Sequence, residues 1–279
     1  MSDTPIDVFI DLPSSPGPVQ AGRLWSHFRK GRESASFEYN KEWLANPYRF
    51  ALEPLLPLSD GTFHTTPGHS VFGAIGDSTP DRWGRILMRR AELARARAAN
   101  ESPHTLSELD YLLMVNDESR QGALRFSQDG GQSFCAPPGT TPIPPLVNLS
   151  RLLHAADHFC RDDENAEDLR LLLAPGSSLG GARPKASVKD KSGQLCIAKF
   201  PRHDDEYNVV AWEAVALSLA SKSGLQVPRF ELEKIADKDV LIVWRFDRTQ
   251  EQRRIAYLSA MSMLGARDNE QHSYLEIVD

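Results

Sequence analysis

Hydrophobic and polar positions alternate in the first forty residues, in the pattern of a half-buried β-sheet. Residues 6–12 alternate toward a strand, and VQAGRLWSHF and ESASFEYN do the same on either side of the charged turn RKGRE. These segments predict a small antiparallel sheet. Further along, GALRFSQDGGQSFC returns to strand and turn chemistry around Asp129.

Helical periodicity replaces this alternation in DSTPDRWGRILMRRAELARARAAN. Ser78 and Asp81 have the spacing of a capping box, and Pro80 is tolerated in the first turn. A second helix is predicted in LSELDYLLMVND. The apolar stripe of the first helix consists of Trp83, Ile86, Leu87 and Leu93.

A proline-rich connector, APPGTTPIPPL, follows at residues 136–146 and cannot form a helix, so we place a subdomain junction there. Helices are predicted near 148–160 and at 166–173, followed by a strand to about Lys189, the turn DKSG and a strand ending at LCIAKF. A helix opened by Asp204 or Asp205 and closed by Gly224 comes next. The last predicted element is a hairpin that turns at 237–239.

Composition and charge narrow the class of protein. A chain of 279 residues with 41% hydrophobic residues is long enough for two ordinary domains. The net charge of -6 and a pI near 5.8 argue against broad coating of nucleic acid. The three cysteines have no CxxC spacing, and no signal peptide or membrane-spanning window is evident, so we expect a cytoplasmic protein with reduced thiols.

The stretch LLAPGSSLGGARPKASVKDKSGQLCIAKF, residues 171–199, carries the candidate chemistry. It is not a Walker loop, because Gly181 is followed by Ala182 and then a strand. A glycine-rich turn within a β-hairpin is instead typical of protein kinases, where backbone N–H groups approach phosphate oxygens. The chain then supplies a strand lysine, Lys199, and a helix glutamate, Glu213, in the order found in a kinase N-lobe.

Each of these features has a simpler interpretation. Gly180 and Gly181 could form a plain loop, Lys199 could extend along an edge strand, and Glu213 could be a surface charge. The order in which they occur favours the nucleotide site. The segment VWRFD, ending at Asp247, lies where a kinase hinge would read adenine, and Asp247 could accept from a ribose hydroxyl.

The segments GSSLGGARPKA, IAKFP, EAVALSLASKSGLQVP and VWRFDR resemble consecutive signatures of HipA-type serine/threonine kinases, the toxins of bacterial toxin–antitoxin pairs. VFGAIGDSTPDRWGRILMRRAE is similar to the end of the family's N-terminal subdomain. The resemblance implies an α+β fold with a β-rich N-terminal subdomain at 1–135, the connector at 136–147, a kinase-like N-lobe of antiparallel sheet plus helices at 148–250, and the start of a helical C-lobe at 251–279.

The resemblance also implies roles for individual residues. Ser178 falls on the serine that such kinases autophosphorylate, and phosphate there should oppose ATP binding. Glu213 would hold Lys199 in place. The implied ATP-binding residues are Gly180, Gly181, Ala182, Arg183, Pro184, Lys185, Lys199, Trp244, Arg245, Phe246 and Asp247.

By the same resemblance, the reaction is phosphoryl transfer from ATP with Mg²⁺ to a protein serine or threonine, possible targets being aminoacyl-tRNA synthetases. A HipB-like DNA-binding antitoxin is the implied partner, and contact with DNA would be indirect. We expect the family's helical lobe, with its catalytic and metal-binding aspartates, to be missing, so that the chain is inactive alone and self-associates. The alternative is a non-catalytic module that binds an antitoxin or a separately encoded C-lobe.

Three further patterns are candidates of lower specificity. RDN at 267–269 mimics part of a kinase catalytic loop, with a polar interhelical loop as the alternative. His154 and His158 have i, i+4 spacing on an amphipathic helix, yet no third metal ligand is evident. The arginines of the 82–97 helix form either a solvated face or a surface for a partner or DNA.

Overall fold

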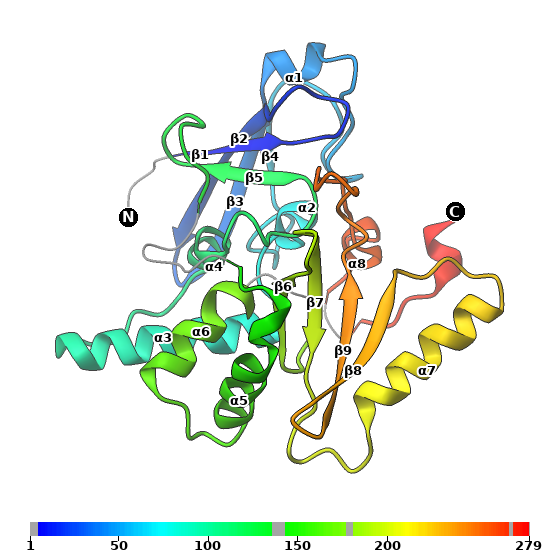
Figure 1. The fold of residues 1–279 in the computed structure, drawn as a ribbon. Coiled ribbons are helices and arrows are strands. Elements are labelled where there is room, and N and C mark those ends of the chain that lie inside the picture. Colours follow the sequence, from blue (N-terminus) through cyan, green and yellow to red (C-terminus); the bar gives the residue numbers. More distant parts are fainter. Residues whose placement is uncertain (1–4, 136–142, 177–180, 268–269, 279) are drawn as a thin grey trace.

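Two antiparallel sheets organise the part of the chain that the computed structural model describes, residues 5–135, 143–176, 181–267 and 270–278 (Figure 1). The first sheet lies at the top of Figure 1 and the second lies below it, between helices. The fold is α+β, as the sequence predicts. Among the described residues, no helix combines the length and apolar character that crossing a membrane requires.

The first sheet is formed by five strands in the order β4-β3-β2-β1-β5. The hairpin between its two longest strands turns at Lys30 and Gly31, which both have positive φ, as the predicted charged turn requires. Alternate residues of the strands enter one core, which includes Val8, Leu24 and Phe37. The strands are β1 (Ile6–Ile10), β2 (Val19–Arg29), β3 (Arg32–Tyr39), β4 (Thr62–His64) and β5 (Leu124–Ser127).

Short helices surround this first sheet. In α4, Ser107 and Asp110 form a capping box, so this helix begins where a polar pair satisfies its free N–H groups. The backbone N–H groups of Glu108 and Leu109 also donate to the carboxylate of Glu33 on β3, which ties the helix to the sheet. The helices here are α1 (Lys41–Ala45), α2 (Gly73–Gly76) and α4 (Glu108–Met114).

The second sheet has the order β6-β7-β9-β8, and its elements follow the predicted succession of strands and helix. Its strands are β6 (Lys185–Lys189), β7 (Leu195–Lys199), β8 (Phe230–Ile235) and β9 (Lys238–Trp244). The helices of this part are α3 (Arg82–Ala99), α5 (Leu149–Cys160), α6 (Ala166–Gly176) and α7 (Val209–Lys222), with a 3-10 turn, η1, at Leu146–Asn148.

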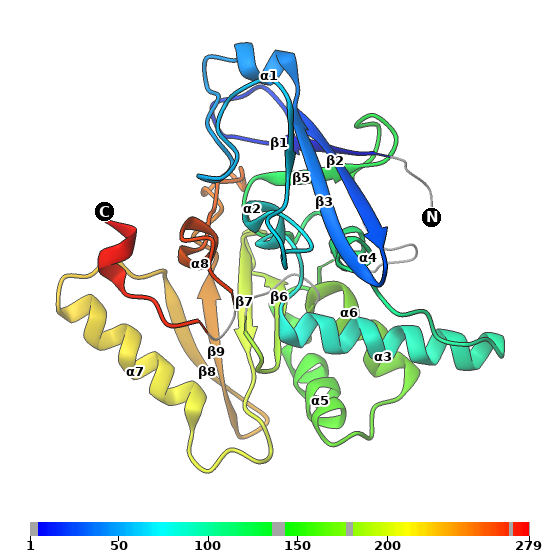
Figure 2. The same cartoon turned by 180° about the vertical axis from the view of Figure 1, so that it is seen from behind.

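The two faces of the second sheet are covered by different helices, as Figures 1 and 2 show from opposite sides. Ala186, Val188 and Ala198 point to one face and pack against residues of α3, α5 and α6. The opposite face carries Leu241 and Val243, which pack against α7. Because side chains alternate along a strand, Lys185 and Lys199 lie on the α7 face.

Helix α3 belongs to the core of the second sheet, although it comes before the proline-rich connector in sequence. The Trp83 indole is buried and makes an edge contact with Phe159 of α5, with ring centroids 5.2 Å apart. Its Nε1 donates to the Lys185 carbonyl at 2.9 Å. The start of α3 is thereby fixed against the first residue of β6.

Two helix starts differ from the predictions. Asp81, and not Ser78, caps α3 by accepting from the Gly84 N–H at 3.3 Å. Asn208, and not Asp204 or Asp205, caps α7 by accepting from Ala211 N–H. The two aspartates have other partners, because Asp204 pairs with Arg202 and Asp205 pairs with Arg183.

Other boundaries agree with the sequence more closely. Gly224 has a φ of +83° directly after the C-cap of α7, as predicted. The β8–β9 turn lies at Ala236 and Asp237, one residue earlier than predicted, and both have positive φ. The chain then continues to two single turns, α8 (Ala260–Met263) and η2 (Tyr274–Ile277).

Candidate functional site

An ion pair between Lys199 and Glu213 is the first feature of the candidate site. Lys199 is the last residue of β7, and its ammonium contacts the carboxylate of Glu213 in the second turn of α7. An ammonium at the end of an apolar strand needs an anionic partner, and α7 supplies one from the same face of the sheet. Both side chains remain about one third exposed, so the pair is open to a ligand.

Lys185 faces Lys199 directly across the β6–β7 ladder. Its side chain is almost fully buried, and its ammonium lies 3.5 Å from Oδ2 of Asp81, at the start of α3. Burial lowers the pKa of Lys185, Asp81 opposes this fall, and the nearby Lys199 ammonium adds to it. Two lysines therefore converge at one end of the hairpin, and each has one acidic partner.

The backbone at Gly181 closes over the Lys185 ammonium. This residue has a φ of +97°, and a Cβ atom there would lie 3.1 Å from Lys185 Nζ. Its carbonyl accepts from the Trp83 N–H at 3.3 Å. Glycine is required because the positive φ and the close approach both disfavour a side chain. Gly180 and Ser178 lie outside the described residues.

The other residues of the predicted loop have separate roles in the structure. Arg183 forms an ion pair with Asp205, and Ala182 is exposed. The Pro184 carbonyl accepts from Phe200 N–H at 3.0 Å, which continues the β6–β7 hydrogen bonding beyond Lys185. The loop is thus fastened to the hairpin at its carboxyl end.

The two aromatic residues of the predicted hinge differ in burial: Trp244 is packed within the protein, and Phe246 is exposed. Trp244 donates from Nε1 to Asp190 Oδ2 at 2.9 Å, and the Arg229 guanidinium lies 3.9 Å from its ring centroid. Phe246 is 62% exposed, and its ring centroid lies 5.8 Å from that of Tyr257. Of these two aromatic residues, Phe246 is the one that solvent reaches more.

The carboxylate of Asp247 is buried and bonded to other residues of the protein. This residue is 2% exposed, and its oxygens accept from Arg245 at 2.7 and 2.5 Å, from Arg248 at 2.9 Å and from Gly122 N–H at 2.8 Å. Arg245 also donates to the Ser119 carbonyl at 2.6 Å. These bonds join the end of β9 to the loop before β5, so we leave Asp247 and Arg245 out of the nucleotide site.

The less specific candidates do not assemble into a second site. Arg267 of the RDN segment donates to the Pro67 carbonyl and contacts His69, while positions 268 and 269 lie outside the described residues. His158 contacts Asp168 at 3.0 Å. Within the described ranges, no group of three His, Cys, Asp or Glu side chains could hold a metal ion.

Several arginines of α3 bind acidic side chains within the molecule and do not form a uniformly solvated face. Arg85 pairs with Glu108, and Arg95 pairs with Glu92 and Glu101. Arg90 pairs with Asp162 and Glu164, which follow α5. The helix is therefore held to neighbouring segments by charge as well as by Trp83.

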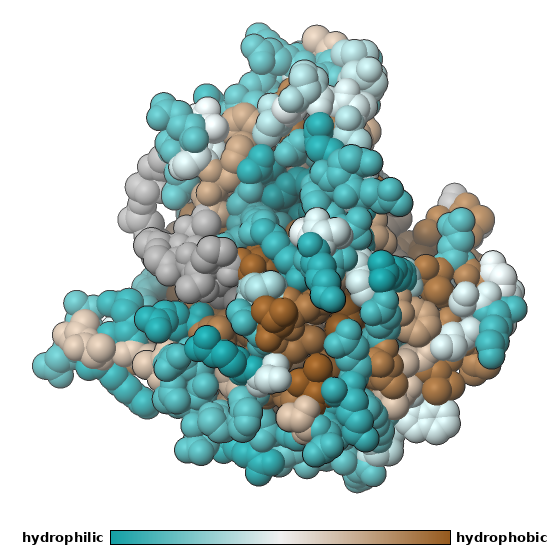
Figure 3. All heavy atoms as spheres, in the orientation of Figure 1, coloured by the Kyte–Doolittle hydropathy of each residue, from teal (hydrophilic) through white to brown (hydrophobic). Residues whose placement is uncertain are grey.

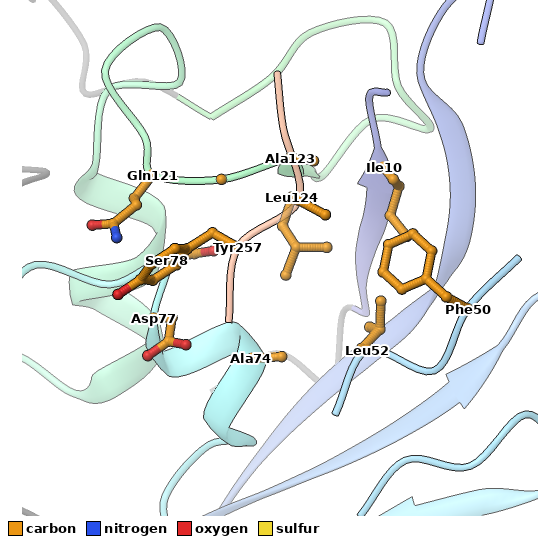
Figure 4. A pocket seen from close by; sticks show the side chains of 12 residues that line it. Ile10, Phe50, Leu52, Ala74, Asp77, Ser78, Gln121, Ala123, Leu124 and Tyr257 are labelled. Atoms are coloured by element: carbon orange, nitrogen blue, oxygen red, sulfur yellow. The ribbon is translucent and has the colours of Figure 1, made fainter. Parts of the chain in front are cut away.

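A small, partly open cavity of about 20 Å³, which no lysine lines, lies between the first sheet, α2 and Tyr257 (Figure 4). Asp77, Ser78 and Gln121 contribute its polar wall. Burial raises the pKa of Asp77, whose oxygens accept from Ser259 N–H at 2.6 Å and from Ser262 Oγ at 2.9 Å. A cavity of this size holds about one water molecule and no nucleotide.

The sequence predicted that Lys199 and Glu213 meet, and the family resemblance added Lys185, but neither indicated Asp81 as a neighbour of these residues. The local sequence around Asp81 indicates a helix cap and no contact with a lysine. The contact with Lys185 depends on how α3 packs against β6, which no local sequence pattern reports.

Comparisons with known proteins agree with this architecture. The elements define a kinase-like α+β lobe beside a β-rich domain. A model of the HipA N-terminal domain matches residues 17–127, and a model of the HipA-like C-terminal domain matches residues 177–279. The chain belongs to the HipA family.

A chain of the solved Shewanella oneidensis MR-1 complex of HipA, HipB and operator DNA has a similar fold. The alignment has a TM-score of 0.50 and 17% sequence identity, and covers 94% of this chain and 57% of that one. This chain thus spans less than two thirds of the length of that relative. No curated protein sequence matches the chain.

Proposed function

We propose that this chain carries the nucleotide-binding half of a HipA-type protein kinase. The observation that carries the proposal is the Lys199–Glu213 ion pair, which lies next to Lys185 on the α7 face of the second sheet. In protein kinases a strand lysine held by a helix glutamate binds the α- and β-phosphates of ATP. Family membership supports the same assignment.

In this proposal, the phosphates lie between the backbone of residues 181–182 and the two lysine ammonium groups. Lys199 neutralises phosphate charge, Glu213 orients Lys199, and Lys185 supplies a second set of donors. Phe246 contacts the adenine. Ser178 remains a proposed site of autophosphorylation, at which a phosphate would oppose the nucleotide by charge repulsion.

Magnesium would enter with the nucleotide, because Mg²⁺ in such sites is bound largely by phosphate oxygens and water, with one or two carboxylates. Transfer to a protein serine or threonine needs in addition an aspartate that accepts the hydroxyl proton. We assign that base to no residue of this chain. A HipB-like antitoxin as partner, and an aminoacyl-tRNA synthetase as target, rest on family membership alone.

Hydrogen–deuterium exchange with and without Mg-ATP tests the site. We expect ATP to slow exchange in residues 181–185, in β7 and at the start of α7, because ligand contacts suppress local opening. Slowed exchange confined to the first sheet, or none at saturating ATP, would contradict the proposal.

A second candidate function, a binding module without catalysis, is favoured by the outer surface of α7. Trp212, Val215 and Leu219 are exposed on this helix, and apolar atoms gather along it in Figure 3. Apolar patches of this kind are typical of protein interfaces. Co-sedimentation of a HipB-like antitoxin with the wild type and with the double variant Trp212→Ser, Leu219→Ser would test it: we expect the antitoxin to sediment with the wild type alone.

A further inference from the structure

We infer that Asp81, at the start of α3, is a positioning residue for the nucleotide site, because it holds the Lys185 ammonium beneath the backbone of Gly181. The inference rests on the proposed function and extends the site across the family's two domain matches. Asp81 and α3 lie in the match to the HipA N-terminal domain, whereas Lys185 lies in the match to the C-terminal domain.

Three contacts connect the first turn of α3 to the segment from Gly181 to Lys185. The Trp83 N–H donates to the Gly181 carbonyl at 3.3 Å, and the Trp83 indole donates to the Lys185 carbonyl at 2.9 Å. The third contact joins Asp81 Oδ2 to Lys185 Nζ at 3.5 Å. The two contacts of Trp83 fix backbone, whereas the contact of Asp81 fixes the charged group that would meet phosphate.

The charges around Lys185 explain why it needs Asp81. Its ammonium is buried, and Lys199 lies on the same face of the neighbouring strand. Glu213 pairs with Lys199, and its charge also favours the charged form of Lys185, less strongly than Asp81 does. Without Asp81, burial and the repulsion from Lys199 would act against the charged form of Lys185, and the weaker attraction of Glu213 would oppose them alone among these causes, so the ammonium would turn away or its pKa would fall further.

The Asp81–Lys185 contact also leaves donors for a ligand. An ammonium has three N–H donors, and a distance of 3.5 Å is longer than the 2.7–2.9 Å of a short charge-assisted hydrogen bond. Lys185 can therefore keep Asp81 on one side while it donates to a phosphate oxygen on another. Glu213 contacts Lys199 more closely than Asp81 contacts Lys185.

Calorimetric titration with Mg-ATP of Asp81→Asn, Lys185→Met and the double variant tests the inference. Asparagine caps a helix as well as aspartate does, so α3 should keep its start and the thermal midpoint should change little. We expect Asp81→Asn to weaken ATP binding about tenfold, the size typical of coupled neighbours. In the Lys185→Met background, the same substitution should have no further effect.

Asp162→Asn serves as the matched control, because Asp162 also pairs with a residue of α3, Arg90, but has no contact with the described residues of the loop. It should bind ATP as the wild type does. ATP binding by Asp81→Asn that equals or exceeds that of the wild type would overturn the inference, as would an equal loss in the Lys185→Met background.

Lys199→Ala separates failure of the inference from failure of the proposed function. If Lys199→Ala weakens binding and Asp81→Asn does not, the nucleotide site stands and the role of Asp81 falls. If the wild type does not bind ATP, or Lys199→Ala binds as tightly as the wild type, both fall together.

Discussion

Lys185 and Lys199 face each other across the β6–β7 ladder, and each ammonium meets a carboxylate from a different helix. Asp81 is the N-cap residue of α3, and Glu213 lies in α7. Two cations on one face of a sheet would repel each other, and the two carboxylates offset that repulsion. An incoming polyphosphate would find both lysines charged and oriented.

Glu213→Gln should weaken ATP binding about tenfold. Glutamine keeps the size of the side chain but removes the charge that orients Lys199, and hydrogen bonds to charged groups contribute about 1.5–3 kcal/mol. Calorimetry measures the effect. Glu206→Gln removes an exposed charge just before α7 and should leave the affinity unchanged.

Gly181→Ala should reduce both stability and ATP affinity. Alanine at a φ of +97° is strained by about 1–3 kcal/mol, and its Cβ would crowd the Lys185 ammonium. Gly31→Ala is the matched control, because Gly31 has a φ of +75° and open space around it. Thermal unfolding should show a loss in both variants, whereas ATP binding should weaken only in Gly181→Ala.

Asp247→Asn should lower the free energy of unfolding by about 3–5 kcal/mol, because it breaks a buried network with two arginines. Urea denaturation at pH 7 measures this loss. Asp237→Asn, at an exposed turn with positive φ, should cost little. If Asp247→Asn has the same free energy of unfolding as the wild type, the network does not hold the two domains together.

The same carboxylate predicts how stability depends on pH. Burial alone would raise the pKa of Asp247, but hydrogen bonds and charge from Arg245 and Arg248 outweigh it and lower the pKa. A lowered folded-state pKa contributes stability above the unfolded pKa of about 3.9, and this contribution is lost as pH falls through the folded value. The wild type should therefore lose more stability than Asp247→Asn on acidification below about pH 4.

Much of the fold follows from local sequence. The turn at Lys30 and Gly31 lies where alternation breaks, and α7 ends at Gly224 as glycine at that position predicts. The start of α7 was predicted wrongly, because Asp205 has a distant partner in Arg183.

In the candidate site, too, some contacts follow from the order of residues in the chain and others depend on distant packing. The order of Gly181, Lys199 and Glu213 in the chain predicts their meeting, because a hairpin followed by a helix returns to the same face. Asp247 was predicted to face a ribose, although the arginines on either side of Phe246–Asp247 already signalled an internal partner. The contact between Asp81 and Lys185 spans 104 positions, and only the packing of α3 explains it.

The central claim is that Lys199 binds the phosphates of a nucleotide, and calorimetric titration of Mg-ATP into wild type, Lys199→Ala and Lys191→Ala tests it most directly. Lys191 is exposed in the turn at the opposite end of the same hairpin, so its loss changes the net charge equally without touching the site. We predict that Lys199→Ala weakens binding by about tenfold to a hundredfold, while Lys191→Ala binds as the wild type does. Equal affinities in all three proteins would contradict the account.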